Sequence, residues 1–168
     1  MLTQRALDFA ALAHTGQMYG TQPYIAHLIE VTDVLQEFVP HAEESMRAAA
    51  WLHDAVEDTS VTLVDVRNEF GLHVADLVDA VTTEPGKNRK ERNALTYPKI
   101  HRTPGAVTLK LADRIANVRS CWRTQDAKLF MYQREYRDFR VALRIPEDLQ
   151  TRPMWDELDR LLGWWEPK

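Results

Sequence analysis

Residues 48–59 constrain the fold of this 168-residue chain more than any other stretch. The segment begins with Ala, Trp and Leu and has no charged side chain before His53, which is typical of a helix buried on most of its surface. Asp54, Glu57 and Asp58 then follow inside the same segment. Burying these groups without partners would cost several kcal/mol each, so they require a cation, one another or water. A bound metal ion is the simplest partner.

One helix is expected over residues 43–58. In a helix, His53 and Glu57 are neighbours four residues apart, and so are Asp54 and Asp58. The four side chains are therefore predicted to form two adjacent rows on one side. Glu57 and Asp58 fall at the C-terminal end, where carboxylates oppose the helix dipole, so a bound metal would explain why they are there.

Apolar residues recur at helical spacing along most of the remaining chain. No alternating pattern of useful length predicts a strand. The predicted fold class is therefore all-α, a compact multi-helix bundle, with the polar and irregular residues 82–92 at its surface. The other predicted helices span residues 3–16, 24–38, 106–118, 126–143 and 154–164, with two more around 63–70 and 74–81 that are broken at Gly71.

Length and composition predict one globular domain over residues 1–168, with about 126–168 as a C-terminal helical extension packed on it. The formal net charge of −4 gives no general attraction to nucleic acid or to an anionic membrane. Cys121 is the single cysteine, which excludes an intramolecular disulfide and fits a reducing compartment. The first residues lack a signal-peptide pattern and no apolar run approaches ~18 residues, so a cytoplasmic protein without a membrane anchor is expected.

Four candidate metal ligands lie in or beside apolar segments: His27, the adjacent His53 and Asp54, and Asp113. A single histidine on an apolar helix is more often a hydrogen-bonded core residue, and a single aspartate there more often joins an ion pair. Their occurrence together favours a metal site. Nitrogen and oxygen donors without a thiolate suit Mn, Fe, Zn or Co.

These four residues also carry a family resemblance. In order and approximate spacing they match the H...HD...D pattern of the HD-domain metal-dependent phosphohydrolases. More narrowly, roughly two thirds of the chain resembles the hydrolase domain of the RelA/SpoT alarmone enzymes, whose hydrolase-only members include the small alarmone hydrolases and the metazoan SpoT homologues. The segments that carry this resemblance are His-Thr-Gly-Gln at 14–17, Pro-Tyr-Ile-Ala-His at 23–27, Leu-His-Asp-Ala-Val-Glu-Asp-Thr at 52–59, Phe-Gly at 70–71 and Lys-Leu-Ala-Asp-Arg-Ile-Ala-Asn-Val at 110–118.

The resemblance implies a Mn²⁺-dependent hydrolase that removes the 3′-pyrophosphate of the alarmones ppGpp and pppGpp. Position by position, the family's metal ligands correspond to His27, His53, Asp54 and Asp113. Its catalytic acidic pair corresponds to Glu57 and Asp58, and a substrate contact to Asn117. One turn beyond the His-Asp pair, Glu57 is placed to orient or deprotonate the attacking water, while Asp58 would share that task or act as an acid. Spacing leaves the choice between them open.

Cations are expected where the charged pyrophosphate leaves. The candidates are Lys110 and Arg114, together with Arg89 and Lys90 from the basic cluster at residues 87–92.

One departure concerns the nucleotide. After His-x-Gly-Gln the alarmone hydrolases typically have a basic pair, whereas this chain has Met18 and Tyr19. Tyr19 is a candidate to stack on a base, but the positive charge is missing. This favours a second hypothesis, an HD phosphohydrolase of another nucleotide such as an adenine alarmone, a nucleoside monophosphate or NADPH. A third hypothesis is an antitoxin-like binding module with a structural metal, against which the retained Glu57 and Asp58 argue.

Overall fold

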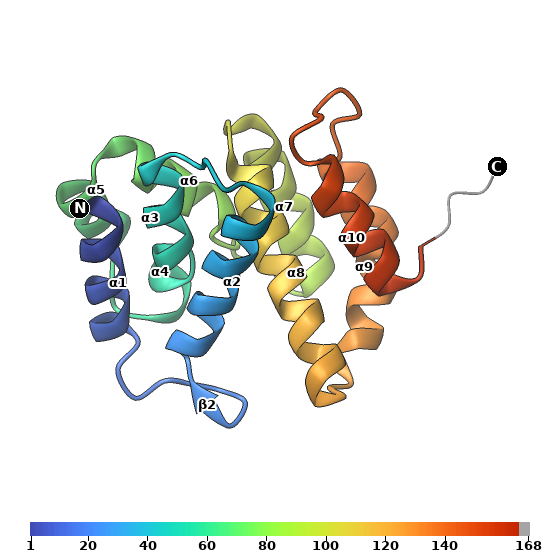
Figure 1. The fold of residues 1–168 in the computed structure, drawn as a ribbon, viewed down its shortest axis with the longest axis horizontal. Coiled ribbons are helices and arrows are strands. Elements are labelled where there is room, and N and C mark those ends of the chain that lie inside the picture. Colours follow the sequence, from blue (N-terminus) through green and yellow to red (C-terminus); the bar gives the residue numbers. More distant parts are fainter. Residues whose placement is uncertain (165–168) are drawn as a thin grey trace.

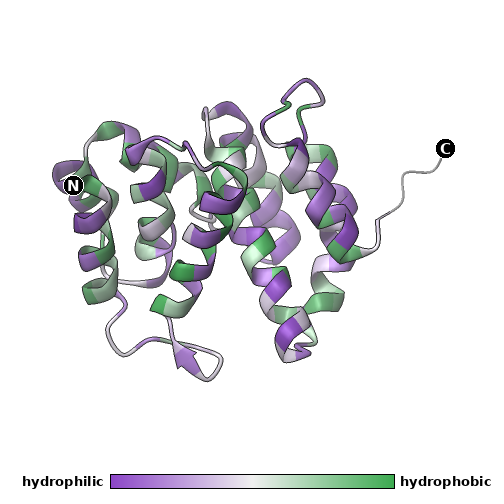
Figure 2. Cartoon of the chain, in the orientation of Figure 1, coloured by the Kyte–Doolittle hydropathy of each residue, from purple (hydrophilic) through white to green (hydrophobic). Residues whose placement is uncertain are grey.

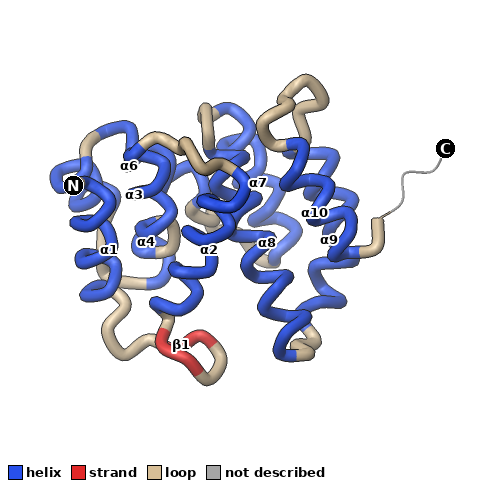
Figure 3. Tube along the Cα trace, in the orientation of Figure 1, coloured by secondary structure: helices blue, strands red, loops and turns tan. Residues whose placement is uncertain are grey.

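The structure, a computed structural model, describes residues 1–164. Helices make up most of it, and the two short strands pair as an antiparallel hairpin in the loop after the first helix (Figure 3). The all-α prediction is therefore confirmed. The elements are α1 (Leu2–Ala13), β1 (Met18–Tyr19), β2 (Gln22–Pro23), α2 (Ile25–Phe38), α3 (Glu44–Leu52), α4 (Ala55–Asp58), α5 (Leu63–Phe70), α6 (Leu72–Val81), α7 (Arg89–Arg102), α8 (Ala106–Thr124), α9 (Lys128–Leu143) and α10 (Arg152–Leu162).

Helix α8 runs through the middle of the bundle (Figure 1). It packs against α2 and α6 on one side and against α9 and α10 on the other. Most of its length is buried, including two charged residues, Asp113 and Arg114. A charged residue on α8 can therefore meet partners from both halves of the molecule.

The C-terminal helices are attached by an apolar stripe. On α10, Met154, Trp155, Leu158, Leu161 and Leu162 recur at helical spacing and are all buried. Hydrophobic and hydrophilic residues both occur on every long helix (Figure 2), as amphipathic packing requires. Within residues 1–164, no helix is both long enough and apolar enough to cross a membrane.

The expected single helix over residues 43–58 is wrong, because the chain leaves the helix at His53 and Asp54 and resumes as α4. The imidazole of His53 explains the break. Its Nδ1 donates to the carbonyl oxygen of Ala50 at 2.9 Å, so a side chain occupies an acceptor that the backbone would otherwise use. Asp54 and Asp58 still lie one helical turn apart, because the backbone N–H of Asp58 donates to the carbonyl oxygen of Asp54.

Helix α7 was not predicted, because residues 89–102 are polar and contain Pro98. The local signal that identifies it is a cap. The side chain of Asn88 accepts from the backbone N–H of Glu91, as an N-cap residue does. The basic cluster at residues 87–92 thus opens a helix rather than lying in an irregular loop.

Candidate metal centre and active site

His27, His53 and Asp113 converge at the centre of the bundle. They come from α2, from the turn after α3 and from α8, and each offers one ligand atom within 4.8 Å of the others. The Nε2 atoms of His27 and His53 lie 3.5 and 3.8 Å from Oδ1 of Asp113. All three residues are buried. Contact of α2 with both α3 and α8 brings these elements together.

Asp54 adds a second carboxylate to this group. Its Oδ2 lies 3.0 Å from Nε2 of His53 and 3.5 Å from Nε2 of His27. The same oxygen accepts a hydrogen bond of 2.6 Å from the hydroxyl of Tyr24. The break in the helix at this point allows adjacent His53 and Asp54 to aim at one centre.

The two imidazoles and two carboxylates hold one another in their charged forms. Burial alone would lower the pKa of His27, but hydrogen bonds and charge from Asp113 and Asp54 outweigh it and raise this pKa to about 9. Burial would raise the pKa of Asp113, but Lys110 and the two histidines hold it well below its ordinary range. The pKa of Asp54 is lowered in the same way by His53 and His27. The two carboxylates thus favour positive charge at their centre, which a divalent cation would also supply.

The donor set fits a divalent transition metal. The Nδ1–H of His53 is held by the Ala50 carbonyl, so its Nε2 is the nitrogen that faces the carboxylates. That Nε2 is fully buried and makes no hydrogen bond within residues 1–164. A buried nitrogen without a hydrogen bond, aimed at two carboxylates and a second imidazole, is a ligand geometry that Mn, Fe, Co or Zn can use.

Glu57 and Asp58, adjacent in sequence, are held by different parts of the chain. Oε2 of Glu57 accepts from the backbone N–H of Thr83 at 2.9 Å. Oδ2 of Asp58 accepts from Nε2 of Gln17 at 3.2 Å. Both carboxylates are exposed to solvent, whereas His27, His53 and Asp113 are buried. Glu57 and Asp58 are therefore accessible to a substrate that reaches the metal ligands.

Tyr19 and Asn117 connect the hairpin to the candidate metal group, which consists of His27, His53, Asp54 and Asp113. The hydroxyl of Tyr19 donates to Oδ1 of Asn117 at 2.8 Å, and Nδ2 of Asn117 donates in turn to the carboxylate of Asp113. The Tyr19 ring stacks on His27, with centroids 4.8 Å apart. Tyr19 therefore covers one face of a candidate ligand.

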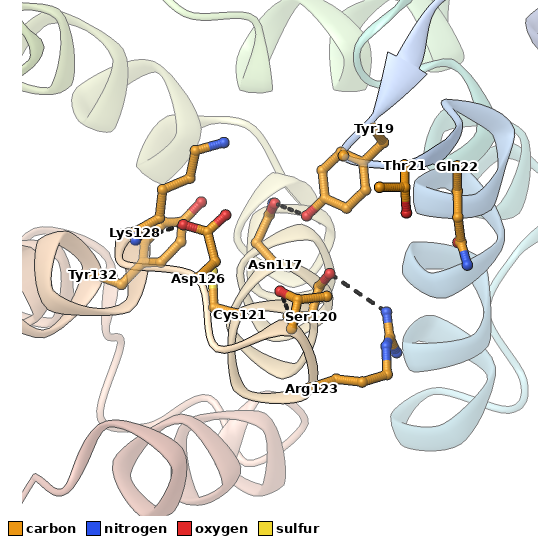
Figure 4. Close-up of a pocket in the computed structure, with 12 residues that line it drawn as sticks. Tyr19, Thr21, Gln22, Asn117, Ser120, Cys121, Arg123, Asp126, Lys128 and Tyr132 are labelled. Atoms are coloured by element: carbon orange, nitrogen blue, oxygen red, sulfur yellow. Dashed lines mark hydrogen bonds between the residues drawn. The ribbon is translucent and has the colours of Figure 1, made fainter.

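A cavity of about 440 Å³ opens beside this pair. Figure 4 shows its walls, with the Tyr19 and Asn117 hydrogen bond at one side and residues from the end of α8 and the start of α9 at the other. Its lining includes Tyr19, Asn117, Ser120, Arg123, Lys128 and Tyr132. Aromatic, amide and cationic side chains thus surround a space that is linked to Asp113 through Tyr19 and Asn117.

The predicted cations divide into two sets. Nζ of Lys110 lies 2.8 Å from Oδ2 of Asp113, directly at the metal group. Arg89 lines a second cavity of about 300 Å³ together with Glu57 and Arg92. Lys110 thus lies at the candidate ligands, whereas Arg89 lines the second cavity while its Nε pairs with Glu135 on α9.

Arg114 and Lys90 point elsewhere. The guanidinium of Arg114 is buried against the rings of Phe139 and Tyr132, at 4.3 and 4.8 Å from their centroids. Lys90 lines a separate cavity between α7 and α9. The structure does not bring either side chain to the metal group, because each faces α9.

Three residues near the site were given no role from sequence: His14, Gln17 and Tyr24. Tyr24 contacts Asp54, and Gln17 contacts Asp58. Their only sequence signal is their place in the two short motifs at 14–17 and 23–27.

A family model and the sequences of known proteins both match this chain. The sequence model of the HD domain matches residues 6–139. The human guanosine-3′,5′-bis(diphosphate) 3′-pyrophosphohydrolase MESH1 is 40% identical over 119 residues, covering 68% of this chain and 66% of that protein. The guanosine-3′,5′-bis(diphosphate) 3′-pyrophosphohydrolase of Aquifex aeolicus is 36% identical over 130 residues, covering 74% of this chain and 18% of that protein.

Two solved structures are similar to this fold over most of the chain. A metazoan orthologue of SpoT, described as hydrolysing ppGpp, superposes with a TM-score of 0.81 at 28% identity, covering 98% of this chain and 97% of that one. A Listeria monocytogenes protein superposes with a TM-score of 0.71 at 27% identity, covering 84% of this chain and 94% of that one.

Proposed function

This chain belongs to the HD domain family, and we propose that it is a Mn²⁺-dependent hydrolase that removes the 3′-pyrophosphate of ppGpp and pppGpp. The products would be GDP or GTP and pyrophosphate. The observation that carries the proposal is the convergence of His27, His53 and Asp113, with two exposed carboxylates in the short helix after His53, in a chain 40% identical over 119 residues to a protein named for this activity.

The metal ligands in this proposal are His27, His53, Asp54 and Asp113. A bound divalent ion would supply a more acidic water and neutralise charge on the phosphate. Lys110, held on Asp113, contributes a further positive charge at the same place. Fe, Co or Zn would satisfy the same donors, and Mn²⁺ is our choice from the family resemblance.

Glu57 and Asp58 are the proposed catalytic carboxylates. Water attacks the phosphorus attached to the ribose 3′-oxygen, its proton passes to a carboxylate, and the bond from phosphorus to the 3′-oxygen breaks as that oxygen gains a proton. Arg89, which shares a cavity with Glu57, would meet negative charge on the pyrophosphate.

The nucleoside would occupy the 440 Å³ cavity beside Asn117. Hydrogen bonds from Tyr19 to Asn117 and from Asn117 to Asp113 connect this cavity to the proposed metal ligands. Lys128 and Tyr132 from α9 also line it, so we propose that residues 1–168 act as one domain whose C-terminal part completes the substrate pocket. A nucleotide substrate and the lone thiol of Cys121 favour the cytoplasm as its compartment.

A hydrolysis panel with Mn²⁺ tests the proposal. It would contain ppGpp, pppGpp, pppApp, NADPH and nucleoside monophosphates, with products identified by mass. We expect pyrophosphate from ppGpp and pppGpp, and its loss in Asp54→Ala. Glu57→Gln and Asp58→Asn should each lower kcat by about 10² or more while Mn²⁺ binding persists. A folded, Mn²⁺-loaded protein that leaves both guanosine alarmones intact would refute the proposal.

A second candidate function is hydrolysis of another phosphorylated nucleotide. The hairpin favours it, because exposed Met18 and stacked Tyr19 bring no cation to the pocket. Release of orthophosphate or pyrophosphate from NADPH, pppApp or a monophosphate in the same panel would select this alternative and retain the metal site.

A further inference from the structure

Gln17 bridges two side chains that are far apart in sequence. Its Nε2 donates to Oδ2 of Asp58 at 3.2 Å, and its Oε1 lies 2.6 Å from Nδ1 of His14. We propose that His14 and Gln17 form a relay that positions the carboxylate of Asp58 for catalysis. The proposal rests on the function proposed above, in which Asp58 is a catalytic group.

The direction of both hydrogen bonds follows from the chemistry of Asp58. An ionised carboxylate only accepts hydrogen bonds, so the amide NH₂ of Gln17 must face it. The amide oxygen of Gln17 then faces His14, and Nδ1 of His14 must carry the proton. The other ring nitrogen, Nε2, needs no proton in this arrangement. It is buried and makes no hydrogen bond within the described part of the chain.

The side chain of His14 is held in a fixed position. It is 4% exposed, and its ring stacks on that of Tyr24 with centroids 4.6 Å apart and planes inclined by 10°. The Tyr24 hydroxyl donates to Asp54. The stacked pair thus reaches two carboxylates of the site, Asp54 through Tyr24 and Asp58 through Gln17.

Asp58 needs such a support because of where it lies. It is the last residue of the short helix α4, and it is exposed. An exposed aspartate has several accessible rotamers, and only some of them direct an oxygen at the reacting water. Glu57 is held instead by the backbone of Thr83, so the relay acts on one carboxylate of the pair.

Two substitutions at His14 separate hydrogen bonding from packing. His14→Phe keeps a flat ring against Tyr24 and removes the donor to Gln17. His14→Asn removes the ring and retains an amide N–H near the position of Nδ1. For a relay, kcat should fall about tenfold in His14→Phe and in Gln17→Leu, and should recover to within about threefold of wild type in His14→Asn, with KM unchanged.

The matched control is Gln4→Leu, which removes a glutamine that donates to Asp8 on the exposed face of α1. It should leave kcat unchanged. If His14 served packing alone, the order would reverse, with His14→Phe active and His14→Asn impaired. Wild-type kcat in His14→Phe would overturn the relay.

A measurement without turnover keeps this result separate from the proposed function. Nitrogen-15 NMR of histidine-labelled protein, loaded with diamagnetic Zn²⁺ at about pH 8 where free imidazole is neutral, reports which ring nitrogen carries the proton. The His14 signals are those lost in His14→Phe. A proton on Nδ1 supports the relay, and a proton on Nε2 overturns it. An inactive wild-type enzyme would refute the proposed function while this measurement still decides the relay geometry.

Discussion

The two oxygens of the Asp113 carboxylate face different partners. Nζ of Lys110, one turn away on α8, lies 2.8 Å from Oδ2, while Oδ1 lies 3.5 Å from Nε2 of His27. The lysine thus lies at Oδ2, while Oδ1, which also accepts from Nδ2 of Asn117, faces the proposed metal position. Burial opposes the charge on Asp113, and Lys110 is the largest influence that lowers its pKa.

We therefore expect Lys110→Met to destabilise the metal-free protein. Removing one partner of a partly buried pair leaves the other charge with less compensation, and a loss of about 2 kcal/mol in the free energy of unfolding is expected. Urea denaturation in the presence of a chelator measures it. Lys110→Arg, which keeps the charge, is the control and should lose less. Equal stability of Lys110→Met and wild type would show that the ion pair contributes nothing.

Chelation should lower the melting temperature of the wild-type protein. A ligand present at 100 times its Kd stabilises the folded state by about 2.7 kcal/mol, which is about 5–10 °C for a chain of this size. Calorimetry with and without Mn²⁺ measures the shift. His27→Ala, which lacks one proposed ligand, should respond much less. A wild-type Tm that is the same with and without Mn²⁺ would argue against an interior metal site.

Alanine at Gly105 is expected to destabilise the protein. It precedes α8 with φ of +84°, and a Cβ there would lie 2.6 Å from Cε of Met46. The left-handed conformation alone costs an alanine about 1–2 kcal/mol, and the contact with the flexible end of Met46 adds a smaller amount. Gly163→Ala is the matched control, because its φ is +67° but a Cβ there meets open space. Denaturant unfolding should show the larger loss for Gly105→Ala, and equal losses would exclude the steric contribution.

Arg119 joins three helices through carboxylates whose ionisation should make stability depend on pH. Its guanidinium pairs with Glu37 on α2 and Glu157 on α10. A hydrogen bond from Arg119 lowers the pKa of Glu37. Burial opposes the charge on Glu157, but hydrogen bonds from Arg160 and Arg119 lower its pKa. Because both folded-state pKa values are depressed, this stabilisation is present above the unfolded value of about 4.3 and is lost as pH falls through the folded values.

The corresponding test compares Arg119→Leu with wild type between pH 7 and pH 3. At pH 7 the variant should be less stable by about 1 kcal/mol, since the pairs are partly exposed, and the difference should shrink in acid. Arg5→Leu breaks the exposed pair with Glu69 and serves as the control, with a smaller effect expected. A difference that persists unchanged at pH 3 would mean that Arg119 acts through packing on Phe38 rather than through charge.

The all-α class and the side chains that gather as candidate metal ligands could be predicted from local patterns in the sequence. His53 and Asp54 interrupt an apolar segment, and Asp113 lies in another. An ionisable residue inside an apolar segment can be recognised from a few neighbouring residues, and its burial then requires a charged or polar partner. The bounds of α5 and α6 were likewise predictable, since Gly71 separates two apolar patterns.

The partner that each polar side chain meets could not be predicted locally, because it depends on how the helices pack. Gln17 reaches Asp58 across 41 positions and Tyr24 reaches Asp54 across 30. Arg114 is adjacent to Asp113 in sequence, yet its guanidinium packs between α9 rings. Along a helix, successive side chains point about 100° apart, so neighbours in sequence face different elements. Which elements those are depends on how the helices pack, and no local pattern of residues contains that information.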